Sequence, residues 1–277
     1  MKVSSEKESK FVLSKWYMDC VTDNGEVFIA YWGILQWKGM SIYYASLLKY
    51  DDTEGTKIKT SLRKHLPPLA ESSGVQWGSR SLGFEGKWIS AFSPVERVLL
   101  ASDEGAIQWQ CMQPGASAHL VISPGKSVSG LGYTEQIRMT IKPWLLPIDE
   151  LRWGRFVSET DSIVWIEWRG EKPQTLALRN GAQVGDASVS DERIVLRETG
   201  EVLHLKESRP LREGPLFSTT LHAIPGIKKI VPGRILDAHE CKWRSRGTLE
   251  KAGSSRTGWA IHEVVTLGGG TIGKPRR

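Results

Sequence analysis

The sequence predicts an all-β protein, built from two tandem antiparallel β-barrels that pack together. Short apolar runs separated by Gly, Pro, Asn or Asp fill the chain, and a helical period is hard to find. The two halves also share a spacing, because Trp16 precedes Gly33 by the same number of residues as Trp153 precedes Gly170. The length of 277 residues fits two domains of common size.

The internal repeat sets the predicted domain bounds. The strand-like runs 27–33 and 164–170 align without a gap, and GLGYTE (130–135) matches GWAIHE (258–263) near the ends of the halves. Similarity at this distance indicates two copies of one domain rather than a solenoid. We therefore predict a first barrel over residues 1–141 and a second over residues 151–267. The repeat also predicts that Trp16 and Trp153 occupy equivalent places at the closed ends of their barrels.

The first half begins with a predicted hairpin, because the turn at residues 22–25 contains Asn-Gly, a strong hairpin signal. The fourth run is stopped by Pro67 and Pro68. The pattern also allows short helices near 65–72 and 94–99. The predicted strands of this half are 11–20, 26–31, 41–50, 57–65, 75–80, 81–85, 87–93, 97–101, 106–112, 117–122 and 131–141.

Residues 142–150 are predicted to be an extended connector, because Pro143 and Pro147 forbid regular ladder pairing. The connector is apolar rather than rich in Gly and Ser, so we expect the two domains to pack together. A long connection is predicted at 207–225. The predicted strands of the second half are 151–157, 162–169, 173–179, 182–189, 192–198, 201–206, 227–232, 234–244, 246–251 and 257–266.

The number of strands points to a particular kind of barrel. About eight antiparallel strands are the number at which a barrel closes around one small ligand, which predicts two lipocalin-like (calycin) barrels. Four segments, GLGYTE (130–135), LRWGRF (151–156), VWIEWRG (164–170) and GWAIHE (258–263), resemble the AttH-like and carotenoid hydratase (hydroxyneurosporene synthase) superfamily. This resemblance implies a double lipocalin-like barrel, but its short motifs transfer no catalytic set of residues.

Composition excludes several classes of function. The net charge is +6, yet acidic residues are interleaved with the basic ones and no nucleic-acid-binding motif occurs, so we predict no nucleic-acid partner. The three cysteines are far apart and show no CxxC spacing, which argues against a disulfide framework or a zinc site. Neither a secretory signal nor a transmembrane stretch is found, and a cytoplasmic location is the expectation. No phosphate or dinucleotide motif occurs, so no cofactor is predicted.

Two glutamates are the first candidates for chemistry. With a strand period of two, Glu135 shares an apolar face with Leu131, Tyr133 and Ile137, and Glu263 takes the same position in the second copy. A carboxylate on such a face must find hydrogen-bond donors or its pKa rises. Each glutamate could fix the closure of its barrel, or one could protonate an alkene or a carbonyl in a dry cavity.

Two histidines, His239 and His262, are the other catalytic candidates. Each has a glutamate as its neighbour, Glu240 or Glu263, but adjacent strand residues point to opposite faces and cannot act as a local pair. Across strands, His239 could meet Glu263, or Glu240 could meet His262. No spacing typical of a metal site appears, so none is predicted.

Twelve tryptophans are scattered along the chain, and most are expected to be core or rim residues of a β protein. The aromatic residues predicted to line a ligand cavity are Tyr31, Tyr44, Trp77, Trp165, Trp168 and Trp259. The expected partner is thus a lipophilic small molecule, of isoprenoid or polyketide type. Three functions are compatible with these features. The protein could act on the ligand as a cofactor-free hydratase, cyclase or isomerase, or carry it without catalysis. Alternatively, the barrels could be filled, and the protein would then be a structural or interaction module.

Overall fold

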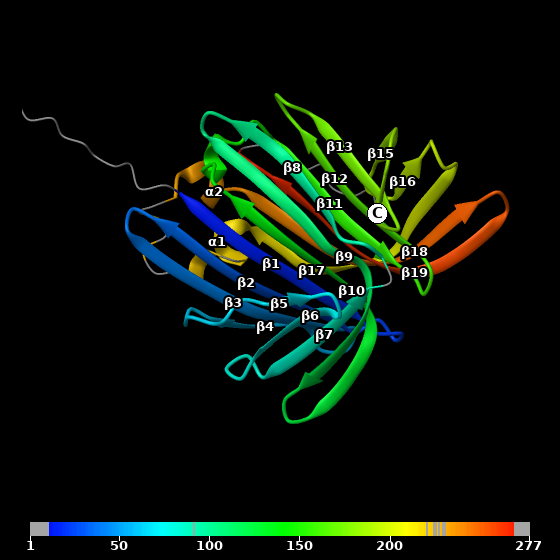
Figure 1. Cartoon of the computed structure of the whole chain (residues 1–277), viewed down its shortest axis with the longest axis horizontal. Helices are drawn as coiled ribbons and strands as arrows, with labels where there is room; N and C mark the ends of the chain where they lie inside the picture. Colours follow the sequence, from blue (N-terminus) through cyan, green and yellow to red (C-terminus); the bar gives the residue numbers. More distant parts are fainter. Residues whose placement is uncertain are drawn as a thin grey trace, which may run out of the picture.

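The computed structural model describes residues 11–90, 92–219, 221–223, 226, 228 and 231–268. Strand makes up 68% and helix 6%, which confirms the predicted all-β fold class. Two large antiparallel sheets pack on one another, one formed by the first half of the chain and one by the second (Figure 1). The division into two folding domains at the connector remains a prediction.

The first sheet contains ten strands within the described ranges, in the order β4-β3-β2-β1-β10-β9-β7-β6-β5, with β8 paired to β9. The long strand β9 pairs with β8 through its first part and with β7 through its second. Its strands are β1 (Val12–Val21), β2 (Val27–Trp37), β3 (Met40–Asp51), β4 (Gly55–Ser61), β5 (Leu69–Glu71), β6 (Gly74–Ser79), β7 (Phe84–Ser90), β8 (Val95–Ser102), β9 (Gly105–Ile122) and β10 (Lys126–Met139).

The second sheet contains nine strands in the part of the chain that the structure describes, in the order β14-β13-β12-β11-β19-β18-β17-β16-β15. Its strands are β11 (Glu150–Val157), β12 (Ser162–Arg169), β13 (Gln174–Arg179), β14 (Ala182–Val184), β15 (Ala187–Val189), β16 (Arg193–Leu196), β17 (Glu201–Pro215), β18 (His239–Lys251) and β19 (Ser254–Thr266). The short helices are η1 (Pro143–Leu145), α1 (Leu216–Thr219), η2 (Leu221–Ala223) and α2 (Gly233–Leu236). None of the described helices has the length and apolar character needed to cross a bilayer.

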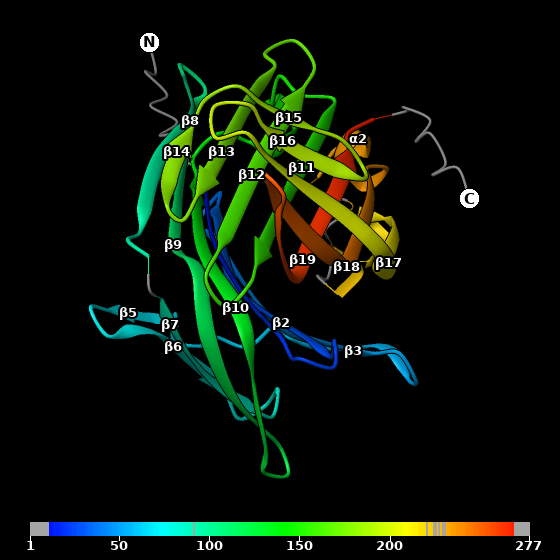
Figure 2. The same ribbon diagram turned by 90° about the vertical axis from the view of Figure 1, so that its right-hand side faces the viewer.

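Several strands are longer than the sequence predicts, because β-bulges carry them past prolines. The runs 106–112 and 117–122 are one strand, β9, whose ladder with β10 shifts register close to Pro114. The connection predicted at 207–225 is wrong over its first part. Strand β17 extends to Pro215, and its ladder with β18 shifts register twice. A bulge supplies the irregular position that a proline needs inside a sheet. Figure 2 shows how far β9 and β10 extend beyond the second sheet.

Other expected elements differ as well. The short helices allowed by the sequence near 65–72 and 94–99 do not form. The first segment contains β5, and the second contains the first part of β8. Helix α2 replaces the beginning of the strand expected at 234–244, and that strand joins the next one to form β18. Most of the strand expected at 227–232 lies outside the described residues.

Strand alternation divides the core into three layers. In β1, Trp16 and Met18 face the inside of the curved first sheet, whereas Tyr17 and Val21 face the second sheet. The second sheet has a corresponding inner layer around Phe156. The layer between the sheets therefore receives side chains from both halves, and it contains the largest of the three apolar clusters.

The two inner layers are filled by large aromatic side chains that pack against glycines. The Trp88 ring covers Gly86, where an added Cβ would lie 2.6 Å from the ring. The Trp165 ring covers Gly154, where the corresponding distance would be 2.1 Å. Both tryptophans are buried. Each sheet thus closes on its own packed core, which leaves the layer between the sheets as the place where the two halves meet.

The equivalence of Trp16 and Trp153 is wrong. Glu135 lies opposite Tyr17 in the ladder of β1 with β10, and Glu263 lies opposite Trp153 in the ladder of β11 with β19. Tyr17 is therefore the counterpart of Trp153, and Trp16 faces the other way. The equal spacing from Trp to Gly in the two halves does not reflect equivalent positions, because the connections differ in length by one residue. Residues 22–26 connect β1 to β2, whereas residues 158–161 connect β11 to β12.

The same equivalence pairs Asp19 with Arg155, and these two counterparts form a buried ion pair between the sheets. Arg155 Nε donates to Asp19 Oδ2 at 3.0 Å and Nη2 donates to Oδ1 at 2.6 Å, with both side chains fully buried. The Tyr17 hydroxyl donates to Asp19 Oδ2 at 2.8 Å, and Arg155 Nη1 donates to the carbonyl of Trp259 at 2.7 Å. Burial raises the pKa of Asp19, and the guanidinium of Arg155 opposes that shift.

Trp16 and Trp153 are each 5% exposed, so truncation of either should open a large cavity. We expect Trp16→Ala and Trp153→Ala each to lower the free energy of unfolding by about 3–5 kcal/mol. Chemical denaturation of the two variants measures this loss. Losses well below about 1 kcal/mol at both sites would contradict the packing described above.

Removal of one partner from the Asp19–Arg155 pair leaves the other charge buried. We expect Asp19→Leu or Arg155→Met to cost about 3–5 kcal/mol each, and the double variant to cost clearly less than the sum. A double-mutant cycle by denaturant unfolding checks this. Glu54→Gln, which breaks the exposed pair with Lys57, serves as the control and should cost about 0.5 kcal/mol or less. Additive losses would show that the two charges do not depend on one another.

Candidate functional site

Glu135 and Glu263 both lie in the layer between the sheets, at equivalent positions of β10 and β19. Trp153 connects them, because it lies opposite Glu263 in the β11–β19 ladder while its indole Nε1 donates to Glu135 Oε2 at 3.1 Å. The face predicted for Glu135 is observed in part: Tyr133 belongs to the cluster between the sheets and Ile137 packs against it, whereas Leu131 does not. The face does not line a barrel interior but forms the contact between the two halves.

Glu135 is 5% exposed, and no basic side chain of the described residues forms an ion pair with it. Its Oε2 atom accepts three hydrogen bonds, from Trp109 Nε1 at 2.6 Å, the Tyr133 hydroxyl at 2.8 Å and Trp153 Nε1 at 3.1 Å. No group of the described residues donates to the other oxygen, Oε1. Burial raises the pKa of Glu135, although the donors from Trp109 and Tyr133 oppose this shift.

Glu263 has the opposite environment. It forms an ion pair with Lys242, whose side chain is 2% exposed against 16% for Glu263. Burial alone would raise the pKa of Glu263, but Lys242 and, at longer range, Lys15 hold it below its usual range. The pKa values of two equivalent carboxyl groups are thus shifted in opposite directions, upwards for Glu135 and downwards for Glu263. Such a divergence is the pattern of a site that separates acid and base roles.

The reason for the divergence lies on the neighbouring strand. Cys111 of β9 lies opposite Glu135, whereas Lys242 of β18 lies opposite Glu263. Cys111 is fully buried, and burial raises the pKa of its thiol, so it remains uncharged beside Glu135. The exchange of a thiol for an ammonium group at equivalent positions thus contributes to the lower pKa of Glu263.

Aromatic rings surround the carboxyl groups. Tyr17 packs edge-on against Trp153 with ring centroids 5.0 Å apart, and against Tyr31 at 5.3 Å. Tyr133 lies 5.6 Å from Trp153. Towards the surface, partly buried side chains extend this aromatic cluster, and they include Tyr44, Ile137, Met139, Trp144, Leu151, Leu216, Val231 and Val265. The carboxyl groups therefore lie in an apolar region with a half-buried border.

His262 lies on the other face of β19, inside the second sheet. Its Nε2 is 2.8 Å from Ser245 Oγ, and its ring stacks on Trp243 with centroids 5.3 Å apart. Burial lowers the pKa of His262 to about 4, so the ring is neutral at pH 7. His262 is thus separated from the two glutamates by the sheet itself.

His239 lies half-buried at the beginning of β18, with Nδ1 3.8 Å from Cys241 Sγ. The pairs considered across strands do not form. In the β18–β19 ladder Thr266 lies opposite His239, and Trp243 lies opposite His262. Strands β18 and β19 therefore do not pair in the register that would place His239 opposite Glu263 or Glu240 opposite His262.

The predicted aromatic residues fall into two groups. Tyr31 and Trp168 belong to the cluster between the sheets, and Tyr44 and Trp259 pack against it. Trp77 and Trp165 belong instead to the packed inner layers of the first and second sheets. Which of these residues contact a ligand remains a prediction.

Sequence reasoning did not identify Lys242, Arg212 and Lys15, which contribute the charges of the site. A signal was present in β18, where Glu240, Lys242, Arg244 and Arg246 alternate with less polar residues. Charged residues at a period of two would suggest an exposed face. Here that face packs against the other half of the chain, and Arg244 donates to the carbonyl of Gly25 at 2.7 Å.

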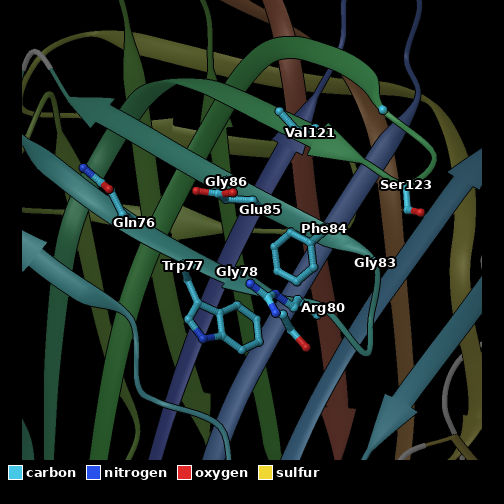
Figure 3. A pocket seen from close by; sticks show the side chains of 12 residues that line it. Gln76, Trp77, Gly78, Arg80, Gly83, Phe84, Glu85, Gly86, Val121 and Ser123 are labelled. Carbon is cyan, nitrogen blue, oxygen red and sulfur yellow. The ribbon is translucent and has the colours of Figure 1, made fainter.

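Two open pockets lie elsewhere. One, of about 590 Å³, is formed by β6, β7 and β9, and in Figure 3 the side chain of Arg80 lies beside the rings of Trp77 and Phe84. The other, also about 590 Å³, lies at the connector and includes Trp144 and Arg234. Neither pocket is lined by Glu135 or Glu263. Among the described residues, no group of three or more His, Cys, Asp or Glu side chains is arranged to hold a metal ion.

Comparison with solved structures places the fold. The chain is similar to CghA, with a TM-score of 0.55 and 10% identity over 93% of this chain and 88% of CghA. It is similar to a putative AttH from Nitrosomonas europaea, with a TM-score of 0.54 and 8% identity over 95% of this chain and 96% of that protein. A structure of CghA with Sch210972 gives a TM-score of 0.53 at 10% identity, over 93% of this chain and 89% of that one.

No family model and no curated protein matches the sequence. The predicted resemblance to AttH-like proteins is therefore confirmed at the level of the fold, which is the double lipocalin-like arrangement of these structures. Identities of 8–10% carry no residue roles from those proteins to this chain.

The buried neutral His262 should make stability depend on pH. The unfolded chain binds a proton near pH 6.5 but the folded chain only near pH 4, so stability is lost as pH falls through this window. We expect the free energy of unfolding to fall by up to about 3 kcal/mol more in the native protein than in His262→Gln between pH 7 and pH 4. Urea unfolding at several pH values measures the difference. Parallel pH profiles for the two proteins would show that His262 titrates normally.

Proposed function

We propose that the protein binds a lipophilic small molecule at the layer between the two sheets and transfers a proton to or from it without a cofactor. The observation that carries this proposal is the contrast between Glu135 and Glu263, two carboxyl groups at equivalent positions: Glu135 accepts hydrogen bonds from Trp109, Tyr133 and Trp153, Glu263 pairs with Lys242, and their pKa values are shifted in opposite directions. Two carboxyl groups whose environments push their pKa values apart are a typical arrangement for acid–base catalysis.

Glu135 is suited to donate the proton. Three donors converge on Oε2, so a proton on this carboxyl group belongs on Oε1, the oxygen that no described residue occupies. The donors also stabilise the carboxylate that remains after transfer. Glu263 stays anionic beside Lys242 and is suited to accept a proton. Addition of water to an alkene, cyclisation and isomerisation each need such a transfer.

The surroundings suit an apolar and partly flat ligand. The partly buried side chains at the border of the layer, among them Tyr44, Ile137 and Trp144, offer apolar area beside the buried rings. In contrast, the inner layers of the two sheets are filled, as the contacts of Trp88 and Trp165 with glycines show. The structure of CghA with Sch210972 gives one case in which a protein of this fold holds a small molecule.

A non-catalytic carrier is the second candidate, and one observation favours it. The three hydrogen bonds to Glu135 and the ion pair of Glu263 also hold strands of the two sheets in register, so both carboxyl groups have a structural use. A carrier needs the apolar surface but no proton transfer. The two functions therefore differ in what happens when Glu135 is replaced by its amide.

The test begins with the compounds that copurify with the protein, identified by mass spectrometry of an organic extract. Binding is measured by quenching of tryptophan fluorescence with cis-parinaric acid, and conversion of the extracted compounds by chromatography. We expect Glu135→Gln to bind within about threefold of the native protein and to lose about 100-fold or more in rate.

Glu96→Gln, an exposed site on β8, is the matched control and should keep both properties. Binding without any conversion by the native protein would favour the carrier. Absence of binding to the native protein would exclude both functions.

A further inference from the structure

The loop at residues 62–68 connects β4 to β5, which are the first and last strands in the order of the first sheet. Two buried indoles bind its backbone from the inside. Trp32 Nε1 donates to the carbonyl of His65 at 3.1 Å, and Trp77 Nε1 donates to the carbonyl of Leu66 at 3.0 Å. The loop is therefore held against the first sheet at two successive residues.

The apolar side chains of this segment are nevertheless exposed. Leu66 is 83% exposed, more than any other large apolar side chain of the described residues, and Leu69 in β5 is 55% exposed. Because the backbone of Leu66 is already fixed by Trp77, its side chain loses little further freedom when another surface covers it. A leucine presented in this way is suited to contact an apolar partner.

The same segment is basic. Residues 55–70 contain no acidic side chain and four basic ones, which are Lys57, Lys59, Arg63 and Lys64. All four are exposed. Among the ion pairs of the described residues, only Lys57 takes part, with Glu54 at 2.7 Å. The other three charges face solvent, where a partner of opposite charge can reach them.

A pocket of about 590 Å³ adjoins this segment and adds another cation. Arg80 is exposed and lines the pocket, and in Figure 3 its side chain lies beside the ring of Trp77, whose Nε1 binds the loop. Lys59 reaches the same pocket, since its Nζ would lie 3.7 Å from a Cβ added at Gly83. Glu85 is the acidic residue among those that line the pocket. The exposed leucines and the basic side chains thus belong to one continuous surface.

We infer that this docking surface, formed by residues 62–68 together with Lys59, Leu69 and Arg80, binds an anionic lipid bilayer. Leu66 and Leu69 enter the interface between headgroups and acyl chains, while the basic side chains contact lipid phosphates and carboxylates. Burial of apolar side chains and attraction to anionic lipids act together at such an interface. The inference is independent of the proposed function, because the docking surface contains neither Glu135 nor Glu263.

Two other occupants fit the docking surface less well. A second copy of the chain could pair with the edge strand β4, but the exposed lysines of that strand would then approach those of the copy. A nucleic acid would match the positive charge, but its phosphate backbone offers no apolar environment to Leu66. A bilayer offers anionic groups and apolar chains at the same place.

Sedimentation of the full chain with large unilamellar vesicles tests the inference. The vesicles consist of phosphatidylcholine alone, or of phosphatidylcholine with about 30% phosphatidylserine, at about 0.1 M NaCl. We expect the native protein to bind the vesicles with phosphatidylserine about tenfold more tightly. This preference should fall several-fold at about 0.5 M NaCl, because salt screens the basic side chains.

Two variants separate the apolar and the charged contributions. Leu66→Ser should weaken binding to the phosphatidylserine vesicles about tenfold, and the double variant Arg63→Gln with Lys64→Gln should weaken it by a similar factor. The matched controls are Leu145→Ser, at a leucine that is 40% exposed on η1, and Lys206→Gln with Lys251→Gln, at two exposed lysines of the second half. Both controls should bind within about twofold of the native protein.

Thermal unfolding of each variant verifies its fold, and Leu69→Ser replaces Leu66→Ser if the latter does not fold. Equal binding of the native protein to both kinds of vesicle would overturn the inference, as would absence of binding to either. Equal losses in the test and control variants would also overturn it, because net charge and not the docking surface would then be responsible. Binding to a single-stranded oligonucleotide as tight as to the phosphatidylserine vesicles, and unchanged in Leu66→Ser, would identify a nucleic-acid surface instead.

Discussion

The buried ion pair between Asp19 and Arg155 is the interaction on which the arrangement of the two halves depends. Both side chains are fully buried and each comes from a different sheet. A buried charge without its partner is costly, so the pair favours the relative position of β1 and β11 in which the two charges meet. Trp153 and Tyr17, two residues earlier on the same strands, are then brought into contact at 5.0 Å between ring centroids. The position of Glu135 beside the indole of Trp153 follows from that contact.

The duplicated halves are complementary at this contact rather than identical. Equivalent positions carry Asp19 in one half and Arg155 in the other, and Cys111 in one half and Lys242 in the other. Two identical faces would have placed like charges against each other, which is unfavourable in a buried layer. Divergence at these positions allows the two sheets to bind each other. It also shifts the pKa values of Glu135 and Glu263 in opposite directions, so the differences between the halves create the candidate site.

The packed side chains inside each sheet restrict where a functional site can be located. Trp88 and Trp165 occupy the space inside the two curved sheets, against glycines that accept no side chain. The polar groups that remain inside the second sheet, His262 and Ser245, satisfy each other. The layer between the sheets is different, because it combines titratable groups with a half-buried apolar border. A site at this place uses residues from both halves, so neither half would carry it alone.

The sequence by itself determined the all-β class, the two copies and the position of each glutamate on an apolar face, because strand alternation and turn residues are local properties of the chain. It did not determine the register of the halves, since the two hairpin connections differ by one residue and a shift of one residue reverses a face. It also did not reveal that the face of Glu135 meets the face of Glu263. The charged alternation of β18 suggests an exposed strand, and only the pairing of β18 with β19 places Lys242 opposite Glu263. The charge state of a buried carboxyl group depends on neighbours that are distant in sequence, which is why Cys111 and Lys242 had to be located in space before Glu135 and Glu263 could be assigned different roles.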